Sequence, residues 1–204
     1  MRPYRFLPLL VLLLAALSPS VAWAQGAPSI DTMFSNFADS SVKLMNMVRW
    51  AGLPIGLYIS GLALIRLKDY SESGGRTKLS TPLLLAAIGA MLIAFPMTAN
   101  IATQTLALGD ATGNSLSQVP SGGGAPGVAA ALAGVLLFVK LVGHIAFFRG
   151  FLILKGVAEG QQGAGVGRAL THIFGGAAAI NINATIDILA NTFAPGMGLQ
   201  GIGL

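Results

Sequence analysis

Two histidines, His144 and His172, are the side chains best suited to metal binding or proton transfer, and the 204-residue chain contains no cysteine. Zinc sites and acid–base centres need several His, Cys, Asp or Glu side chains held at short spacings. No pair of carboxylates occurs at such a spacing within an apolar segment. The sequence therefore predicts a protein that is not an enzyme and that holds no metal or cofactor.

The segment GVAEGQQGAGVG, at residues 156–167, shares only its glycine content with a phosphate-binding loop. A P-loop follows a strand and ends in Lys followed by Ser or Thr, and this segment lacks that ending. Glycine-rich runs of this kind are typical of flexible connections. We expect a loop here rather than a nucleotide site.

Lys140 and Asp187 lie within or beside long apolar segments. A charge placed in hydrocarbon is costly and is usually paired or faces a cavity. We therefore predict that Lys140 and Asp187 form a pair between the last two membrane spans. In the alternative, Lys140 extends its ammonium group to the outer surface and Asp187 already lies at the interface.

The composition indicates the environment in which these residues lie. The chain is 54% hydrophobic and 9% charged, with a mean hydropathy of +0.74. Soluble domains carry about a quarter charged residues. Residues 79–109 contain no Asp, Glu, Lys or Arg, and residues 169–186 contain only His172 as an ionisable group. Runs of this length are typical of membrane spans, so the sequence predicts an all-α membrane protein.

The N-terminus has the layout of a cleavable signal peptide at residues 1–24. Two arginines precede an apolar stretch, and the motif AWA at 22–24 offers a cleavage site. The alternative is an uncleaved anchor helix. Residues 25–48 then repeat apolar side chains at helical spacing, which predicts an extracytoplasmic amphipathic helix at the membrane interface. A helix packed on another subunit fits the same pattern.

The rest of the chain is predicted to form two helical hairpins joined by a linker rich in Gly, Pro and Ser. Each hairpin contains two apolar spans, near the roughly 20 residues that a bilayer requires. The predicted segments are a first hairpin at 49–106, the linker at 107–127, a second hairpin at 128–193 and a C-terminal tail at 194–204. The four spans are placed at 50–67, 83–106, 127–148 and 169–192.

Positive charge is confined to two of the connections between these spans. The loops at 66–80 and 149–168 carry four and three Lys or Arg residues, whereas the linker carries none. By the positive-inside rule both loops are predicted to be cytoplasmic, with the linker and both mature termini periplasmic. The predicted signal peptide independently places the mature N-terminus outside. Because the charge is divided between two short loops, we expect no direct binding of nucleic acid.

Small residues at i, i+4 spacing mark the predicted helix-packing faces. Helices in lipid associate through close backbone approach and polar contacts, since lipid supplies no hydrophobic drive between them. The predicted packing residues are Gly52, Gly56 and Ser60 in the first span, Ala86, Ala90 and Ala94 in the second, and Gly175, Gly176, Ala179 and Asn183 in the fourth. Asn181 and Asn183 are expected to form hydrogen bonds to neighbouring helices.

A weak internal repeat relates the two hairpins. The segment YISGLALIRLK at 58–68 aligns with FFRGFLILKGV at 147–157, which places Gly61 on Gly150 and Arg66 on Lys155. A loop, a basic residue and a helix rich in small residues follow in both halves. Chance similarity between two apolar helices is the alternative explanation.

Two blocks of the sequence resemble a known family. They begin LPIGLYISGLALIRLKDYSESGG at residue 53 and LVGHIAFFRG at residue 141, and the second contains FFRG at 147–150 and THIFGG at 171–176. These blocks resemble the IcmC/DotE family of type IVB secretion and conjugation systems, with similarity to IcmD/DotP and to the Tra counterparts on I-type plasmids. The resemblance implies a non-catalytic subunit of the bacterial inner membrane, whose partners are other apparatus subunits or copies of itself.

Other functions remain open at the level of the sequence. A signal peptide followed by two apolar helices and a basic loop also resembles type IVA conjugative pilins, which polymerise into filaments, and this chain would contain that unit twice. A small transporter or holin is a third class, favoured by the repeat and by Lys140 within a span.

Overall fold

The computed structural model describes residues 30–74, 78–106, 108–109 and 126–193, and these contain six helices and no strand. The helices are α2 (Ile30–Glu72), α3 (Ser80–Ile93), α4 (Phe95–Thr105), α5 (Pro126–Ala158), α6 (Val166–Ile180) and α7 (Ile182–Phe193). The all-α prediction is confirmed for this part of the chain. The predicted signal peptide, most of the linker and the C-terminal tail lie outside the described residues.

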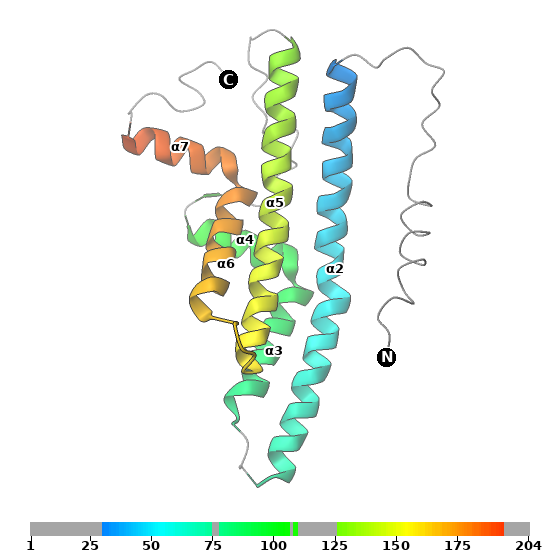
Figure 1. Ribbon diagram of the computed structural model, residues 1–204, viewed down its shortest axis with the longest axis vertical. Helices are drawn as coiled ribbons and strands as arrows, with labels where there is room; N and C mark the ends of the chain where they lie inside the picture. The colour runs from blue at the N-terminus through cyan, green and yellow to red at the C-terminus, as the bar shows by residue number, and fades with distance from the viewer. Residues whose placement is uncertain (1–29, 75–77, 107, 110–125, 194–204) are drawn as a thin grey trace, which may run out of the picture.

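Two long helices, α2 and α5, run side by side in the same direction (Figure 1). At about 1.5 Å per residue they are about 64 Å and about 50 Å long. Helices α3 and α6 return antiparallel to them, and the α2–α3 and α5–α6 turns both lie toward the lower end of the molecule in Figure 1, with the α5–α6 turn well above the α2–α3 turn. The two basic loops therefore both lie toward one end of the long helices, at different heights along α2.

The second and fourth predicted spans are not straight helices. Helix α4 bends away from α3 by 96°, and α7 bends away from α6 by 92°. The described chain has two helices long and apolar enough to cross a membrane, within α2 and α5, or up to four spans if each bent pair counts as one. At about 21 Å, α3 alone is shorter than the roughly 30 Å hydrocarbon core. The predicted four spans are therefore the upper end of the range of two to four that these helices permit.

The predicted interfacial helix is corrected, because residues 30–48 continue directly into the first span as one helix, α2. Ala38, Ser41 and Met45 are buried on this part of α2, and Ala38 and Met45 cluster with Leu137 and Leu141 of α5. Packing along α5 therefore holds this segment on the axis of α2 instead of in the membrane plane.

The structure divides into a first repeat, α2–α4, and a second repeat, α5–α7, whose matching positions are 87 residues apart. The exposed ion pair Lys68–Glu72, at 3.6 Å, corresponds to Lys155–Glu159, at 2.8 Å. Helices α3 and α6 end at the matching residues Ile93 and Ile180. The structure therefore places Lys68, and not Arg66, on Lys155. Because both segments are rich in Leu and Gly, their sequences align almost equally well with an offset of 89 or of 87 residues. The helix contacts are matched only with the offset of 87.

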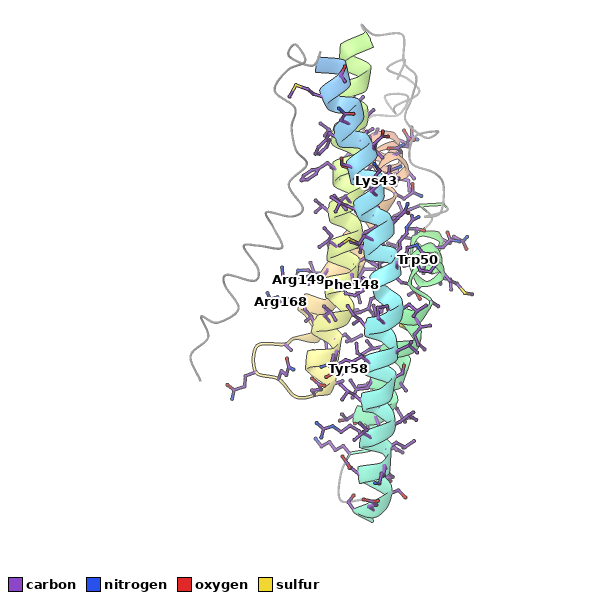
Figure 2. All side chains as sticks on the ribbon, turned by 90° about the vertical axis from the view of Figure 1, so that its right-hand side faces the viewer. Lys43, Trp50, Tyr58, Phe148, Arg149 and Arg168 are labelled. Carbon is purple, nitrogen blue, oxygen red and sulfur yellow. The ribbon has the colours of Figure 1, made fainter. Side chains whose placement is uncertain are left out.

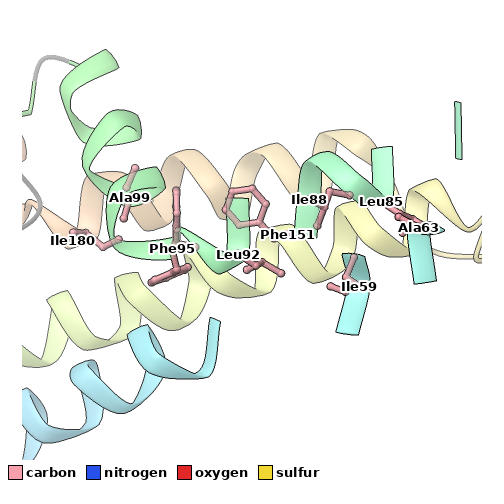
Figure 3. Close-up of a cluster of buried hydrophobic side chains, with 11 residues drawn as sticks. Ile59, Ala63, Leu85, Ile88, Leu92, Phe95, Ala99, Phe151 and Ile180 are labelled. Carbon is pink, nitrogen blue, oxygen red and sulfur yellow. The ribbon is translucent and has the colours of Figure 1, made fainter. Parts of the chain in front are cut away.

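The largest core cluster joins the two repeats. Phe95, at the start of α4, lies against the rings of Phe147 and Phe148 of α5, with centroids 5.6 and 5.7 Å apart. Phe147 in turn contacts Phe151 edge-on at 5.2 Å. Figure 3 shows Phe95 within this cluster, with Ala99 and Ile180 on one side of it and Leu92 and Phe151 on the other. Such pairs add about 0.5–1.5 kcal/mol beyond the area they bury.

Candidate functional site

The closest helix contact of the first repeat joins α2 to α3 through glycines. A Cβ added at Gly56 would lie 2.6 Å from the backbone nitrogen of Ile93 and 2.7 Å from the carbonyl oxygen of Gly89. A Cβ added at Gly89 would lie 2.9 Å from the backbone nitrogen of Ser60. Each glycine thus packs directly on the backbone of the other helix, which is the contact that favours helix association in lipid.

The second repeat makes the same contact between α5 and α6. A Cβ at Gly143 would lie 2.7 Å from the nitrogen of Ile180, and a Cβ at Gly176 would lie 2.5 Å from the nitrogen of Phe147. These four positions correspond one to one with Gly56, Ile93, Gly89 and Ser60. Both hairpins are therefore built around the same pair of glycines.

The structure places the predicted packing residues differently in the two repeats. Gly52, Gly56 and Ser60 lie against α3, and Gly52 also approaches Phe95. In the second repeat Gly176 and Ala179 lie against α5, Gly175 has open space around it, and Asn183 is half-buried.

Ala86 and Ala90 require a correction, because both are exposed on α3. The face of α3 that packs within the chain is a different one, formed by Leu85, Gly89 and Leu92. The i, i+4 rule finds small residues on a helix but does not say which face meets a neighbour within the chain.

The two helix breaks are closed by a matching pair of threonines. The Thr98 hydroxyl lies 2.8 Å from the carbonyl oxygen of Met91 and 3.1 Å from that of Ala94. The Thr185 hydroxyl lies 2.8 Å from the carbonyl oxygen of Ala178 and 3.1 Å from that of Asn181. A helix end leaves its last carbonyls without backbone donors, so these hydroxyls satisfy groups that the break exposes.

The sequences at the two breaks differ although their geometry matches. Pro96 sits in the first turn of α4, where it has no N–H to continue the ladder of α3. The second break instead has Asn181 as the C-cap of α6, and its side-chain amide donates a hydrogen bond to the carbonyl oxygen of Leu108. The predicted hydrogen bond from Asn181 therefore reaches the segment that follows α4.

A polar cluster lies between the long helices. The Nε–H of Arg49, on α2, donates to Nε2 of His144 at 3.2 Å, and Nδ1 of His144 lies 2.8 Å from the carbonyl oxygen of Lys140. Because that carbonyl only accepts, Nδ1 carries the proton and Nε2 accepts from Arg49. His144 and Lys140 are both buried. The cluster joins the two repeats by polar contact beside Phe95, whose ring lies 6.5 Å from that of His144.

Lys140 and Asp187 lie on contacting helices, α5 and α7. Lys140 is buried and Asp187 is half-buried. Their pairing stays a prediction.

His172 lies apart from this cluster on the half-buried side of α6, where its Nδ1 is 2.9 Å from the carbonyl oxygen of Arg168. Within the described residues, no group of three or more His, Cys, Asp or Glu side chains is placed to hold a metal ion. The contacts that the structure brings together are thus those of helix packing.

Sequence reasoning did not find Gly89, Gly143, the threonine pair or the Arg49–His144 contact. The first three become visible once the repeats are aligned 87 residues apart, since Gly56, Gly89 and Thr98 then fall on Gly143, Gly176 and Thr185. The Arg49–His144 contact has no counterpart in the other repeat and needs the tertiary structure. No protein-family model, curated protein or solved structure matches this chain.

Proposed function

We propose that this protein is a non-catalytic inner-membrane subunit of a type IVB secretion or conjugative transfer apparatus. The observation that carries the proposal is the pair of glycine-packed hairpins, with their basic turns directed toward the same end of the molecule. A rigid helical body whose positive loops face the cytoplasm suits a scaffold next to cytoplasmic motor proteins. The transfer system itself is proposed from the resemblance of the blocks at 53–96 and 141–182 to the IcmC/DotE family.

Apolar side chains on the outside of four helices support the membrane location. Large hydrophobic residues are exposed along α2, α3, α5 and α6, and the most exposed of them include Trp50, Tyr58 and Leu64 on α2. Large exposed apolar surface marks contact with lipid or with other proteins. Lipid and neighbouring subunits would both cover it in an assembled apparatus.

A chromosomal or plasmid deletion tests the proposal directly. Cells that lack the protein should lose substrate transfer, and a tagged copy should restore it, remain in the inner-membrane fraction and co-purify with other apparatus subunits. Normal transfer in the deletion strain would contradict the proposal.

The tandem repeat favours one alternative, a pilin-like subunit that polymerises into a conjugative filament. Each repeat consists of an apolar helix, a basic turn and a second apolar helix, which is the arrangement that the pilin resemblance rests on. Shearing of surface filaments separates the two functions. Recovery of the protein in sheared filaments supports the pilin, and membrane-only protein supports the apparatus subunit.

A further inference from the structure

We propose that α7 is an interfacial helix that lies in the plane of the membrane, at the boundary farther from the basic turns, with its apolar side in the acyl chains of that leaflet. By the predicted orientation this is the periplasmic boundary. The partner of this surface is the phospholipid bilayer itself. The proposal rests on the membrane location and not on the transfer function.

Helix α7 leaves the helical body almost at once. It bends away from α6 by 92° and extends sideways (Figure 1). Among the described helices it packs appreciably only on α5 and α6. Its large apolar side chains become more exposed along the helix, from Ile188 at 43% and Leu189 at 51% to Phe193 at 82%. Because isolated helices as short as α7, which has 12 residues, are marginally stable in water, this exposed side requires a partner.

The hydrogen bond between Thr185 and Ala178 fixes which side of α7 faces which end of the molecule. The Thr185 hydroxyl reaches the carbonyl oxygen of Ala178 in the last turn of α6. Helix α6 runs from the basic α5–α6 turn up to α7, so this side of α7 faces the basic turns (Figure 1). Leu189 and Phe193 follow Thr185 at i+4 and i+8, which places them on the same side. The apolar side of α7 is therefore directed toward the body of the spans.

The opposite side of α7 is polar. Asp187 and Asn191 follow Thr185 by two and six residues, which turns them away from it at about 100° per residue. Thr192 lies on the apolar side, but its hydroxyl bonds to the carbonyl oxygen of Ile188, 2.7 Å away, so its donor is satisfied within the helix. A helix divided in this way and lying across the spans suits the boundary between headgroups and acyl chains.

Helix α2 places such a boundary at the level of α7. Leu141, two residues before the glycine that lies against the end of α6, clusters with Met45 of α2, so α7 begins level with Met45. Exposed Lys43 lies on one side of this level, and Trp50, 74% exposed, lies on the other (Figure 2). Residues 50–65 contain no Asp, Glu, Lys or Arg. Tryptophan is enriched at membrane interfaces, so the apolar part of α2 begins just below α7.

The displacement of the two repeats explains why α7, and not α4, takes this position. Arg49 contacts His144, whereas its matching residue is Leu136. The second repeat is therefore displaced along α2, away from the basic turns, by about 12 Å at about 1.5 Å per residue. Helix α4 lies deeper and has buried residues, whereas α7 lies farther out and has none.

Nitroxide-labelled lipids test the proposal, because single cysteines can be introduced into a chain that has none. Full-length Leu189→Cys and Asn191→Cys proteins carry a small fluorophore and are reconstituted into vesicles of phosphatidylethanolamine and phosphatidylglycerol. The lipid nitroxide is attached either near the headgroup or at the end of the acyl chain. The Leu189→Cys label should be quenched more strongly by the shallow nitroxide than by the deep one. The Asn191→Cys label should be quenched mainly by iodide present on both sides of the vesicle.

Leu57→Cys is the control for the membrane location. This position is 55% exposed within the apolar part of α2, about 18 Å below the level of α7 at about 1.5 Å per residue. Its label should be quenched most by the deep nitroxide. If neither nitroxide quenches it, the membrane location fails and the proposal fails with it. If it is quenched and the Leu189→Cys label is not, the interfacial helix alone is wrong.

Two further results would overturn the proposal. Strongest quenching of both α7 labels by the deep nitroxide would make α7 part of a membrane span. Quenching of both labels by iodide alone would place α7 in water.

Hydrogen exchange in the same vesicles gives a second measurement. Leu189→Ser/Phe193→Ser protein should exchange its α7 amides several-fold faster, since the side that binds the acyl chains is lost. Asn191→Ser is the matched control on the polar side and should leave exchange unchanged. Equal exchange along α7 in the two proteins would also contradict the proposal.

Discussion

At the scale of single residues, glycines set the distance between helices in both repeats. Gly56 and Gly143 each face the backbone of the returning helix at matching positions, Ile93 and Ile180. Gly61 lies on the same helix as Gly56 but has nothing within 4 Å of an added Cβ. One helix thus contains a glycine that packing requires and one that it does not.

Gly56→Ala and Gly143→Ala should each lower the thermal midpoint of the protein in detergent. The new methyl group would lie 2.6–2.7 Å from a backbone nitrogen, so a helix has to shift. Overpacking of this kind costs about 1–3 kcal/mol. Gly61→Ala is the matched control and should leave the midpoint unchanged or higher. Equal midpoints for Gly56→Ala and Gly61→Ala would show that the close contact is incidental.

Neutralising Lys140 and Asp187 should reveal whether they interact. A charge at the centre of a span costs about 2.5–3.5 kcal/mol on insertion scales, so removal of one partner leaves the other charge uncompensated. Lys140→Met and Asp187→Asn should each reduce protein level in membranes, and the double variant should lose less than the sum. Strictly additive losses would mean that the two side chains do not interact.

The Lys68–Glu72 pair provides a control cycle for that measurement. Both side chains are more than half exposed at the basic turn, and such i, i+4 pairs couple by only about 0.3–0.5 kcal/mol. The Lys140–Asp187 coupling should exceed this value clearly.

At the scale of elements, each repeat consists of a long helix, a short returning helix and a third helix turned through about a right angle. The residues at the turn differ between the two repeats, with Pro96 in the first turn of α4 and Asn181 as the C-cap of α6. The threonine hydroxyl contacts are the same in both. The bend therefore depends more on a hydroxyl donor for the carbonyl groups at the end of the preceding helix than on one particular residue at the break.

Thr98→Val and Thr185→Val should weaken the breaks. Each change keeps the shape of the side chain and removes the donor to the last turn of α3 or α6. A carbonyl left without a partner costs about 1–3 kcal/mol. Hydrogen exchange at the α3–α4 and α6–α7 junctions should become faster, and the thermal midpoint should fall.

Thr105→Val is the matched control for these variants. Its hydroxyl bonds to the carbonyl oxygen of Ile101, 2.8 Å away, which lies within the continuous ladder of α4. If hydrogen exchange at the breaks is no faster in Thr98→Val than in Thr105→Val, the threonine hydroxyls do not stabilise the breaks.

At the scale of the whole molecule, the two repeats lie in parallel, and their basic turns are directed toward the same end at different heights (Figure 1). This arrangement agrees with the placement of both turns on one side of a membrane by the positive-inside rule. The orientation predicts that the turns face the cytoplasm and that the linker faces the periplasm.

Single cysteines at exposed positions test this orientation. Ser71→Cys and Gln162→Cys, in the two basic turns, should react with a membrane-impermeant thiol reagent only after spheroplasts are permeabilised. Gly123→Cys, in the linker, should react in intact spheroplasts. The reverse pattern would overturn the orientation, and labelling of all three in intact spheroplasts would exclude a cytoplasmic location for the turns.

The sequence by itself determined the helical class, the division into two hairpins and the position of the basic turns. These properties depend on local patterns of hydropathy and charge, such as the charge-free residues 79–109, and a pattern along the chain is sufficient to predict them. Gly52 and Gly56 were found for the same reason, because small residues at helical spacing form a local pattern too.

Only the tertiary structure decided which faces meet and where the helices break. Gly89 contacts α2 while Ala86 and Ala90 on the same helix are exposed, although all three are small. Arg49 reaches His144 across 95 residues of sequence. The faces that meet depend on how each helix is rotated about its axis relative to its neighbour. The position of a break depends on hydrogen-bond donors for the carbonyl groups at the ends of α3 and α6. Both are properties of contacts between distant segments, which a pattern along one helix does not contain.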